Sequence, residues 1–463
     1  MSSVHKQRVR LTPQNTPSGQ TFQPNSFPAI NFVIGRQPAF LDPRTLRLNG
    51  KLSIRNTDGN IVVNDQTAAG SDTNGATLNN SIGVSSLFDE ITIATLNGRP
   101  LETVRSYNRM LAAGKPLLNS SMDYNNGLGL RDPMQTDKSV INQRTANVET
   151  DFSIKLDTGM LDGNRFLNIS DKGFHGLQID LLLAQNATCI QPYYLYTGTR
   201  KADKTAISAD KTYNFEIKDL NLTFDLIRPD DALFAKLPSS GLVTYQTIST
   251  LNSTLLSSDQ TINLRFGQSA VTSVVHSITP ALHINNIHVD SFQLCQPQIN
   301  VQAKADGDVA KVRTVQYMRA GQLFPYNFML DSEKQADLDN VGNPAVQAQI
   351  MKPYLNAASL YDNTHNKLNP LSNIGINSGV VPTGGASYGP GGGLPFSCGP
   401  DPKSVWGLGV PMDANRQGVS FKDREYSIRI QSELNDTDAN SFFTFCRSRN
   451  VAEFSPAGIN VVE

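Results

Sequence analysis

The stretch TLRLNGKLSIRN, residues 45–56, carries the pattern that decides the fold. Its apolar residues Leu46, Leu48, Leu52 and Ile54 share one parity, and the charged residues between them take the other. Alternation with a period of two is typical of a β-strand with one buried face. This stretch therefore predicts a half-buried β-strand.

Asn49 and Gly50, in the middle of this stretch, leave two interpretations open. An Asn-Gly pair between alternating residues is a strong signal for a two-residue hairpin turn. The alternation continues with the same parity across the pair, however, and this is equally compatible with one long strand in which Gly50 faces inward.

The same alternation recurs along most of the chain. It is present in residues 91–93, 152–156, 177–183, 220–226, 262–266, 287–289, 426–430 and 443–445. Pro229 ends the last strand of the first group, because proline cannot donate a ladder hydrogen bond. We therefore expect an N-terminal arm at 1–28, a first β-domain at 29–229 and a second at 230–463.

Predicted helices are few and short, and two loops are long. Helical spacing occurs in residues 102–113, a capping box begins residues 332–338, and residues 345–361 contain a weaker helical stretch. Residues 58–85 and 362–419 lack periodicity, and the second segment contains Trp406, the only tryptophan. We expect these helices to cap the ends of the sandwiches, and we expect the apolar residues around Trp406 to hold the long loop against a surface.

Composition and charge exclude several classes of protein. The 463 residues include 40 Lys and Arg and 41 Asp and Glu, and 39% of them are hydrophobic. This near balance argues against a protein that coats nucleic acid, which needs a strongly basic face. The four cysteines are widely spaced and match neither a disulfide framework nor a zinc site. Neither a secretory signal nor a membrane-spanning segment is predicted.

Apparent catalytic and metal-binding motifs have simpler explanations. Residues 385–389 read Gly-x-Ser-x-Gly, but glycines and prolines flank them where a nucleophile elbow needs a strand and a helix. His276, His283 and His288 are close in sequence but differ in parity, and no carboxylate or cysteine is spaced to complete a ligand set. We therefore expect no catalytic residue, no metal site and no cofactor.

Lys6, Arg8 and Arg10 alternate along the predicted arm. Such an arm is either a solvated tail or a segment that makes an assembly contact or faces an anionic interior. Three positive charges supply only weak, salt-sensitive binding to phosphate.

Two β-rich halves with long inserted loops and little helix indicate tandem jelly rolls. With SSLFDEITIATLNGRPLETVRSYNRML (85–111) and the closing segments 425–434 and 441–462, the chain resembles the double jelly-roll major capsid proteins of icosahedral DNA viruses. That lineage includes polinton-like viruses, virophages and their adenovirus-like relatives. The predicted fold class is therefore all-β, with two tandem jelly-roll β-sandwiches, short capping helices and long loops.

The resemblance implies a structural protein of the virion, without enzymatic activity, that forms pseudo-hexagonal homotrimers. Its expected partners are itself, neighbouring capsomers, and penton and minor capsid proteins, with a weak contact between the N-terminal arm and the genome or an internal membrane. Residue positions with an expected assembly role are Lys6, Arg8, Arg10 and Trp406. The alternative is a tandem jelly-roll protein that binds or processes carbohydrate, although no pair of carboxylates across an aromatic groove is recognisable.

Overall fold

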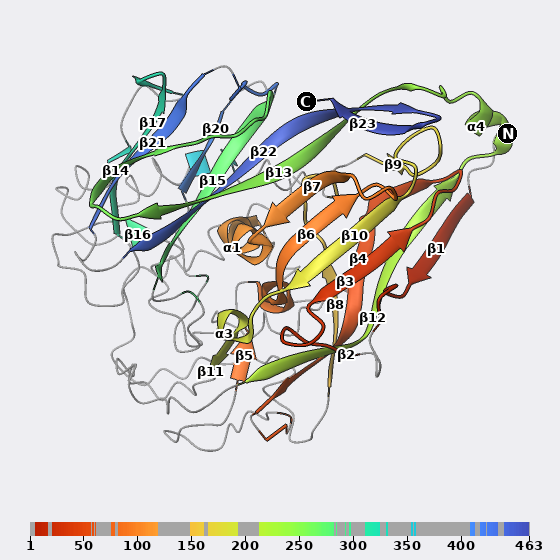
Figure 1. The fold of residues 1–463 in the computed structure, drawn as a ribbon, viewed down its shortest axis with the longest axis horizontal. Coiled ribbons are helices and arrows are strands. Elements are labelled where there is room, and N and C mark those ends of the chain that lie inside the picture. Colours follow the sequence, from red (N-terminus) through yellow and green to blue (C-terminus); the bar gives the residue numbers. More distant parts are fainter. Residues whose placement is uncertain are drawn as a thin grey trace, which may run out of the picture.

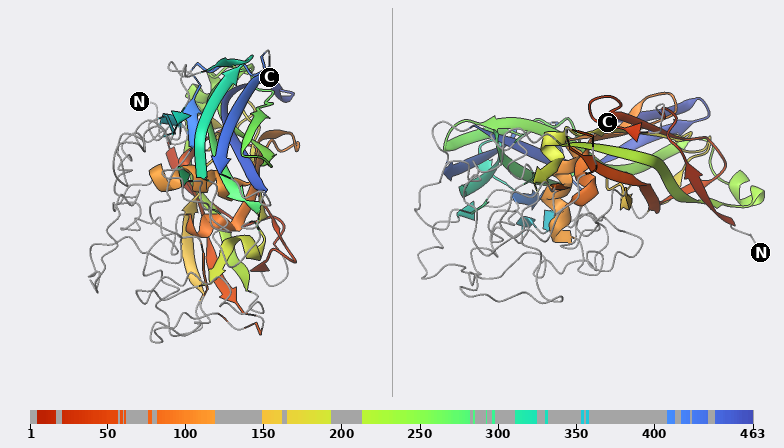
Figure 2. Two further views of the ribbon diagram at one scale, coloured as in Figure 1. Left: turned by 90° about the vertical axis from the view of Figure 1, so that its left-hand side faces the viewer. Right: turned by 90° about the horizontal axis from the view of Figure 1, so that it is seen from below.

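The structure is a computed structural model, and it contains two β-sandwiches that lie side by side (Figure 1). It describes residues 5–16, 21–56, 58–59, 61, 76–78, 82–118, 149–161, 165–192, 213–281, 284, 292, 296–297, 311–324, 330–331, 353–354, 356–357, 408–412, 417–422, 424–433 and 439–462. The strands of both sandwiches run in roughly the same direction, as the left view of Figure 2 shows.

The first sandwich packs two antiparallel sheets against each other. One sheet has the order β1 (His5–Leu11), β12 (Asn214–Arg228), β4 (Phe40–Arg55) and β8 (Thr150–Lys155), with the short strands β2 (Thr21–Phe22) and β9 (Leu167–Asn168) beside them. The other has the order β3 (Ala29–Ile34), β10 (Leu177–Leu183), β6 (Phe88–Ala94) and β7 (Pro100–Arg105). A two-stranded ribbon of β5 (Ala76–Leu78) and β11 (Ile190–Pro192) lies at one end.

The second sandwich also consists of two sheets, which are antiparallel except for one short edge strand. Its first sheet has the order β13 (Gly241–Leu255), β22 (Asn440–Ser455), β15 (Val271–Pro280) and β20 (Leu408–Pro411), and β23 (Gly458–Val462) pairs with β22. Its second sheet has the order β14 (Asp259–Asn263), β21 (Tyr426–Glu433), β17 (Lys311–Arg319) and β16 (Gln296–Pro297), with β18 (Gln322–Leu323) and β19 (Leu330–Asp331) on β17. The expected all-β fold of two tandem jelly rolls is confirmed.

β4 settles the two interpretations of residues 45–56. The strand continues through Asn49 and Gly50 for 16 residues, so the single-strand interpretation is correct and the hairpin is wrong. Gly50 is buried opposite Phe152 of β8, and a Cβ atom there would lie 2.9 Å from the Phe152 Cζ atom. The glycine therefore makes room for an aromatic ring in the core, which is a packing requirement rather than a turn requirement.

The helices are short, and one of them begins later than expected. The described helices are η1 (Gly83–Leu87), α1 (Tyr107–Leu118), α3 (Asn186–Cys189) and α4 (Asp231–Ala235). The predicted helix at 102–113 is wrong in its first turn, because residues up to Arg105 form β7 and pair with β6 after the Asn97-Gly98 turn. Tertiary strand pairing overrides the weak local preference for helix.

Several predictions fall on residues outside the described ranges. These are the helix at 332–338, the strand at 287–289, most of the helical stretch at 345–361, and most of the loop at 362–419, including Trp406. Among the helices that the structure does describe, none has the length and apolar character needed to cross a membrane.

Candidate functional site

The basic arm is an edge strand of the first jelly roll. β1 pairs antiparallel with β12, and Arg8 lies opposite Asp225. Lys6 Nζ is 2.8 Å from Asp225 Oδ2, and Arg8 Nε is 3.8 Å from Asp225 Oδ1. The Asp225 side chain is only 6% exposed, whereas both cations are largely exposed. Two of the three charges on the arm therefore already have a carboxylate partner.

This arrangement changes the interpretation of the arm. Part of the region expected to lack a core, residues 1–28, extends a sheet of the first jelly roll, and Val9 and Leu11 pack against the core. Arg10 lies opposite Thr223 of β12. Because the single carboxylate of Asp225 offsets one of the three positive charges, the arm offers less attraction to phosphate than its sequence implies. Contact of the arm with a genome or a membrane stays a prediction.

The two jelly rolls meet at a junction where β7 of the first lies against β13 of the second. Tyr245 of β13 packs edge-on against Phe174 of the first jelly roll, with 6.0 Å between ring centroids, and its hydroxyl donates to the Leu101 carbonyl at 3.4 Å. The His175 Nε2 atom lies 2.8 Å from the Ser455 carbonyl oxygen of β22. Aromatic packing and polar contacts thus join the two jelly rolls at separate points.

A buried arginine adds a second kind of contact at this junction. Arg109 of α1 is 5% exposed, and its Nη1 donates to Thr279 Oγ1 of β15 at 3.3 Å. Its guanidinium carbon lies 5.0 Å from the ring centroid of Phe443 and 5.5 Å from that of Phe292. Cation–π contacts of this type are strongest where water is excluded. The helix of the first jelly roll is therefore anchored in the core of the second.

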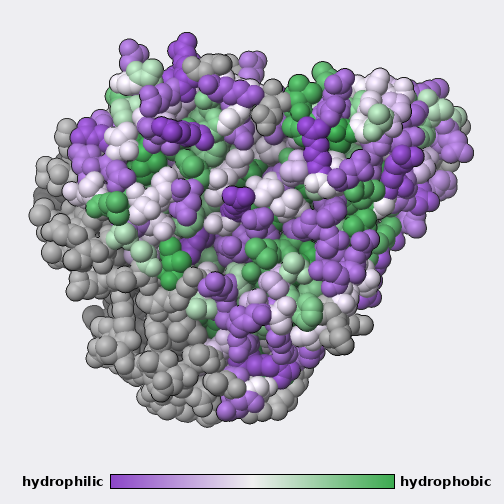
Figure 3. All heavy atoms as spheres, viewed as in Figure 1, coloured by the Kyte–Doolittle hydropathy of each residue, from purple (hydrophilic) through white to green (hydrophobic). Residues whose placement is uncertain are grey.

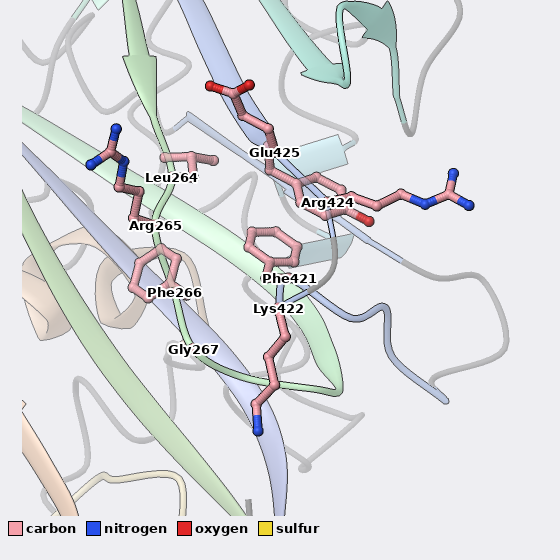
Figure 4. A pocket seen from close by; sticks show the side chains of 9 residues that line it. Leu264, Arg265, Phe266, Gly267, Phe421, Lys422, Arg424 and Glu425 are labelled. Atoms are coloured by element: carbon pink, nitrogen blue, oxygen red, sulfur yellow. The ribbon is translucent and has the colours of Figure 1, made fainter.

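A shallow cavity of about 450 Å³ opens at one end of the second jelly roll. Phe266 and Phe421 form part of its wall, and Arg265, Lys422 and Arg424 surround it (Figure 4). The three cationic side chains point in different directions, so no single small anion can contact all of them. This cavity is consistent with a charged protein surface and lacks the converging groups of a catalytic or anion-binding site.

Two exposed apolar side chains lie on one face of the ribbon formed by β13, β22 and β23, with the exposed residues Thr244, Glu453 and Asn460 between them. Leu242 of β13 is 69% exposed and Val462 of β23 is 45% exposed. Figure 3 shows hydrophobic side chains gathered near the C-terminus, on the same side of the molecule as this ribbon.

The histidine prediction is testable only at His276, since His283 and His288 lie outside the described ranges. His276 is 1% exposed in β15, its Nδ1 lies 2.9 Å from Thr444 Oγ1, and its ring stacks on Phe442 with 4.9 Å between centroids. Burial lowers its pKa from 6.5 to about 3. Within the described ranges, no group of three or more His, Cys, Asp or Glu side chains is placed to hold a metal ion. His276 is a neutral core residue.

Comparisons by sequence find nothing: no family model matches, and no curated protein matches either. Solved structures do match over nearly the whole chain, and the three described next each have a TM-score of 0.52. The PBCV-1 virus capsid is 9% identical and aligns over 100% of this chain and 97% of its own. The Faustovirus major capsid protein is 10% identical and aligns over 97% and 90%. The Sputnik virophage structure is 12% identical and aligns over 98% and 88%. The resemblance expected from the sequence is thus confirmed at the level of the fold.

Proposed function

We propose that this chain is a structural major capsid protein, and that three copies form a pseudo-hexagonal capsomer of an icosahedral viral shell. The observation that carries the proposal is the fold over its full length: two jelly rolls in one chain, similar throughout to viral capsid proteins of three kinds. Three copies would supply six jelly rolls, which is the number of corners in a hexagonal tile.

The junction supports this role. A tile keeps its outline only if its two jelly rolls hold a fixed relative position, and the Tyr245 and Arg109 contacts join them on separate elements. The exposed side chains of Leu242 and Val462 lie on a ribbon that a neighbouring copy would cover. In this role the protein has no enzymatic activity and needs no cofactor, and its location is the virion.

Its partners would be its own copies within the trimer and neighbouring capsomers in the shell. Penton and minor capsid proteins are further expected partners, and the arm residues Lys6, Arg8 and Arg10 together with Trp406 are the expected assembly positions. The solved structures with similar folds are capsid proteins, and they lend no support to a carbohydrate-binding role.

Light scattering coupled to size-exclusion chromatography tests the proposal on the full-length chain. The expected species has three times the chain mass of 50.5 kDa and persists on dilution. Negative-stain images of that peak should show particles with a six-cornered outline. A monomer or a dimer at all concentrations would contradict the proposed capsomer, because a closed three-fold ring is the assembly that places six jelly rolls in one tile.

A further inference from the structure

β7 and β13 come from different jelly rolls and lie next to each other at the junction (Figure 1). Each strand is at the end of its own sheet: β7 pairs with β6, and β13 pairs with β22. The edge of a sheet presents unpaired backbone N–H and C=O groups, and such groups cost free energy when they are buried without partners. The contact between these two edges therefore needs acceptors for the N–H groups of β13.

Glu102 of β7 supplies such an acceptor. Its side chain is buried, with 3% of the residue exposed. Glu102 Oε1 accepts a hydrogen bond from the Ile248 N–H of β13 at 2.7 Å and another from the Gly159 N–H at 2.8 Å. Glu102 Oε2 accepts from the Met160 N–H at 2.9 Å. One carboxylate thus joins β7, the loop after β8 and the edge of the second jelly roll.

The loop after β8 fits this contact closely. A Cβ atom on Gly159 would lie 2.7 Å from the Thr247 Cα atom of β13 and 2.8 Å from Glu102 Oε1. Both distances are shorter than carbon atoms tolerate, and Thr247 Cα belongs to the backbone, so it cannot rotate away. Glycine at position 159 is therefore required for the loop to reach both the carboxylate and the second jelly roll.

The carboxylate is stabilised by hydrogen-bond donors and not by an ion pair. The donors are the three backbone N–H groups and the Thr158 side chain, and burial outweighs them, raising the pKa of Glu102 from 4.5 to about 7. Charged and titratable groups on the neighbouring elements have other partners. These are Asp157 with Lys155 at 2.9 Å, Arg105 with Glu90 at 3.7 Å, Tyr245 with the Leu101 carbonyl, and Arg447 with Gln246.

We propose that Glu102 is a positioning residue whose two side-chain carboxyl oxygens, as acceptors for three N–H groups, hold the joint between the two jelly rolls closed. The joint belongs to the single chain, so it does not depend on assembly into a capsomer. Removal of the Glu102 side chain leaves three N–H groups buried without an acceptor, and the least costly response is a local opening in which β13 separates from β7 and water enters.

Hydrogen exchange measured by mass spectrometry tests this proposal, with wild type compared with E102A, E102Q and the control E90Q. In E102A, exchange should be at least tenfold faster in the peptides that contain Ile248 and residues 157–161, while peptides from β4 and β12 keep their wild-type rates. E102Q retains a carbonyl oxygen and should restore part of the protection. E90Q removes a carboxylate from the neighbouring strand β6 and should change nothing at the joint.

G159A provides a second test that leaves the carboxylate in place. Its added methyl group should displace the loop and produce the same local pattern of faster exchange as E102A, and this outcome is available even if E102A does not fold. The proposal is overturned if a folded E102A or G159A exchanges at wild-type rates at the joint, or if exchange rises equally in all peptides.

Discussion

Two buried groups in this chain should change the free energy of unfolding in opposite directions as the pH changes. Substitutions that isolate each contribution test where the structure places these groups. Glu102 at the junction has its pKa raised by burial from 4.5 to about 7. His276 in the core of the second jelly roll has its pKa lowered by burial from 6.5 to about 3. Because both are buried, solvent screens neither effect strongly.

The direction in which Glu102 changes stability with pH follows from comparing proton binding in the folded and unfolded chains. The unfolded chain takes up a proton at this position only near pH 4.5, whereas the folded chain does so near pH 7. The contribution of Glu102 to stability is therefore complete below pH 4.5 and is lost as the pH rises through 7. At about 1.4 kcal/mol per pKa unit, the total change is about 3 kcal/mol.

His276 changes stability with pH in the opposite direction. The unfolded chain protonates this histidine below pH 6.5, while the folded chain keeps it neutral down to about pH 3. Stability is therefore complete above pH 6.5 and falls as the pH decreases, by about 2 kcal/mol at pH 5. Between pH 6.5 and 4.5 the two groups oppose each other with nearly equal slopes, so their sum is nearly flat.

Substitutions separate the two contributions. E102Q removes the Glu102 contribution and keeps that of His276, so its free energy of unfolding relative to wild type should fall by about 1.4 kcal/mol for each unit by which the pH decreases from 7 to 4.5. H276F keeps the ring stack on Phe442 and should show the opposite slope relative to wild type. Asp89, whose pKa burial raises, is present in all three proteins and cancels from these differences.

Urea unfolding at half-unit steps from pH 7.5 to 4.5, at one protein concentration, measures these slopes. If the free energies of unfolding of E102Q and wild type differ by the same amount at every pH, Glu102 is not the buried group that binds a proton near neutrality. If the free energies of unfolding of H276F and wild type differ by the same amount at every pH, His276 is not kept neutral by burial.

Two further predictions concern the first jelly roll. Replacing Asp225 with asparagine removes the carboxylate that pairs with Lys6 and Arg8, so native-state trypsin should cleave the arm several-fold faster, and an unchanged cleavage rate would contradict the pairing. Gly50→Ala places a methyl group against the Phe152 ring and should destabilise the protein by about 1–3 kcal/mol, visible as a lower thermal midpoint. A midpoint equal to that of wild type would mean that the ring moves aside without cost.

The sequence predicts strands best where one face is buried and the other is exposed. In β10, the residues Leu177, Ile179, Leu181 and Leu183 are buried in strict alternation, as the pattern requires. β15 has no such signal, because every residue from Val271 to Pro280 is buried. A strand covered on both faces loses its period of two, so the segment VTSVVHSITP cannot be recognised from alternation alone.

The junction could not be predicted from the sequence for a different reason. Glu102 and Asp225 look like surface charges in the sequence. Asp225 lies at a polar position of an alternating strand, and Glu102 follows the Asn97-Gly98 turn. Glu102 becomes buried only because β13, which begins far along the chain, lies against β7; its partner Ile248 is 146 residues away. No local pattern encodes a contact of that separation. The charges at the surface of the arm were visible in the sequence, but their carboxylate partner on β12 was not.

The long pairing of β22 with β13 has a mechanical consequence. β22 pairs with β13 without interruption from Gly241 opposite Phe454 to Leu255 opposite Asn440, and its other edge is shared by β15 and β23. A force that pulls β22 lengthwise past β13 must shear this whole ladder at once, because the hydrogen bonds run perpendicular to the strands and carry the load in parallel. A force that peels the strands apart from one end breaks the same bonds one after another. The second jelly roll should thus be strong against tension along its strands and weak against peeling at its ends.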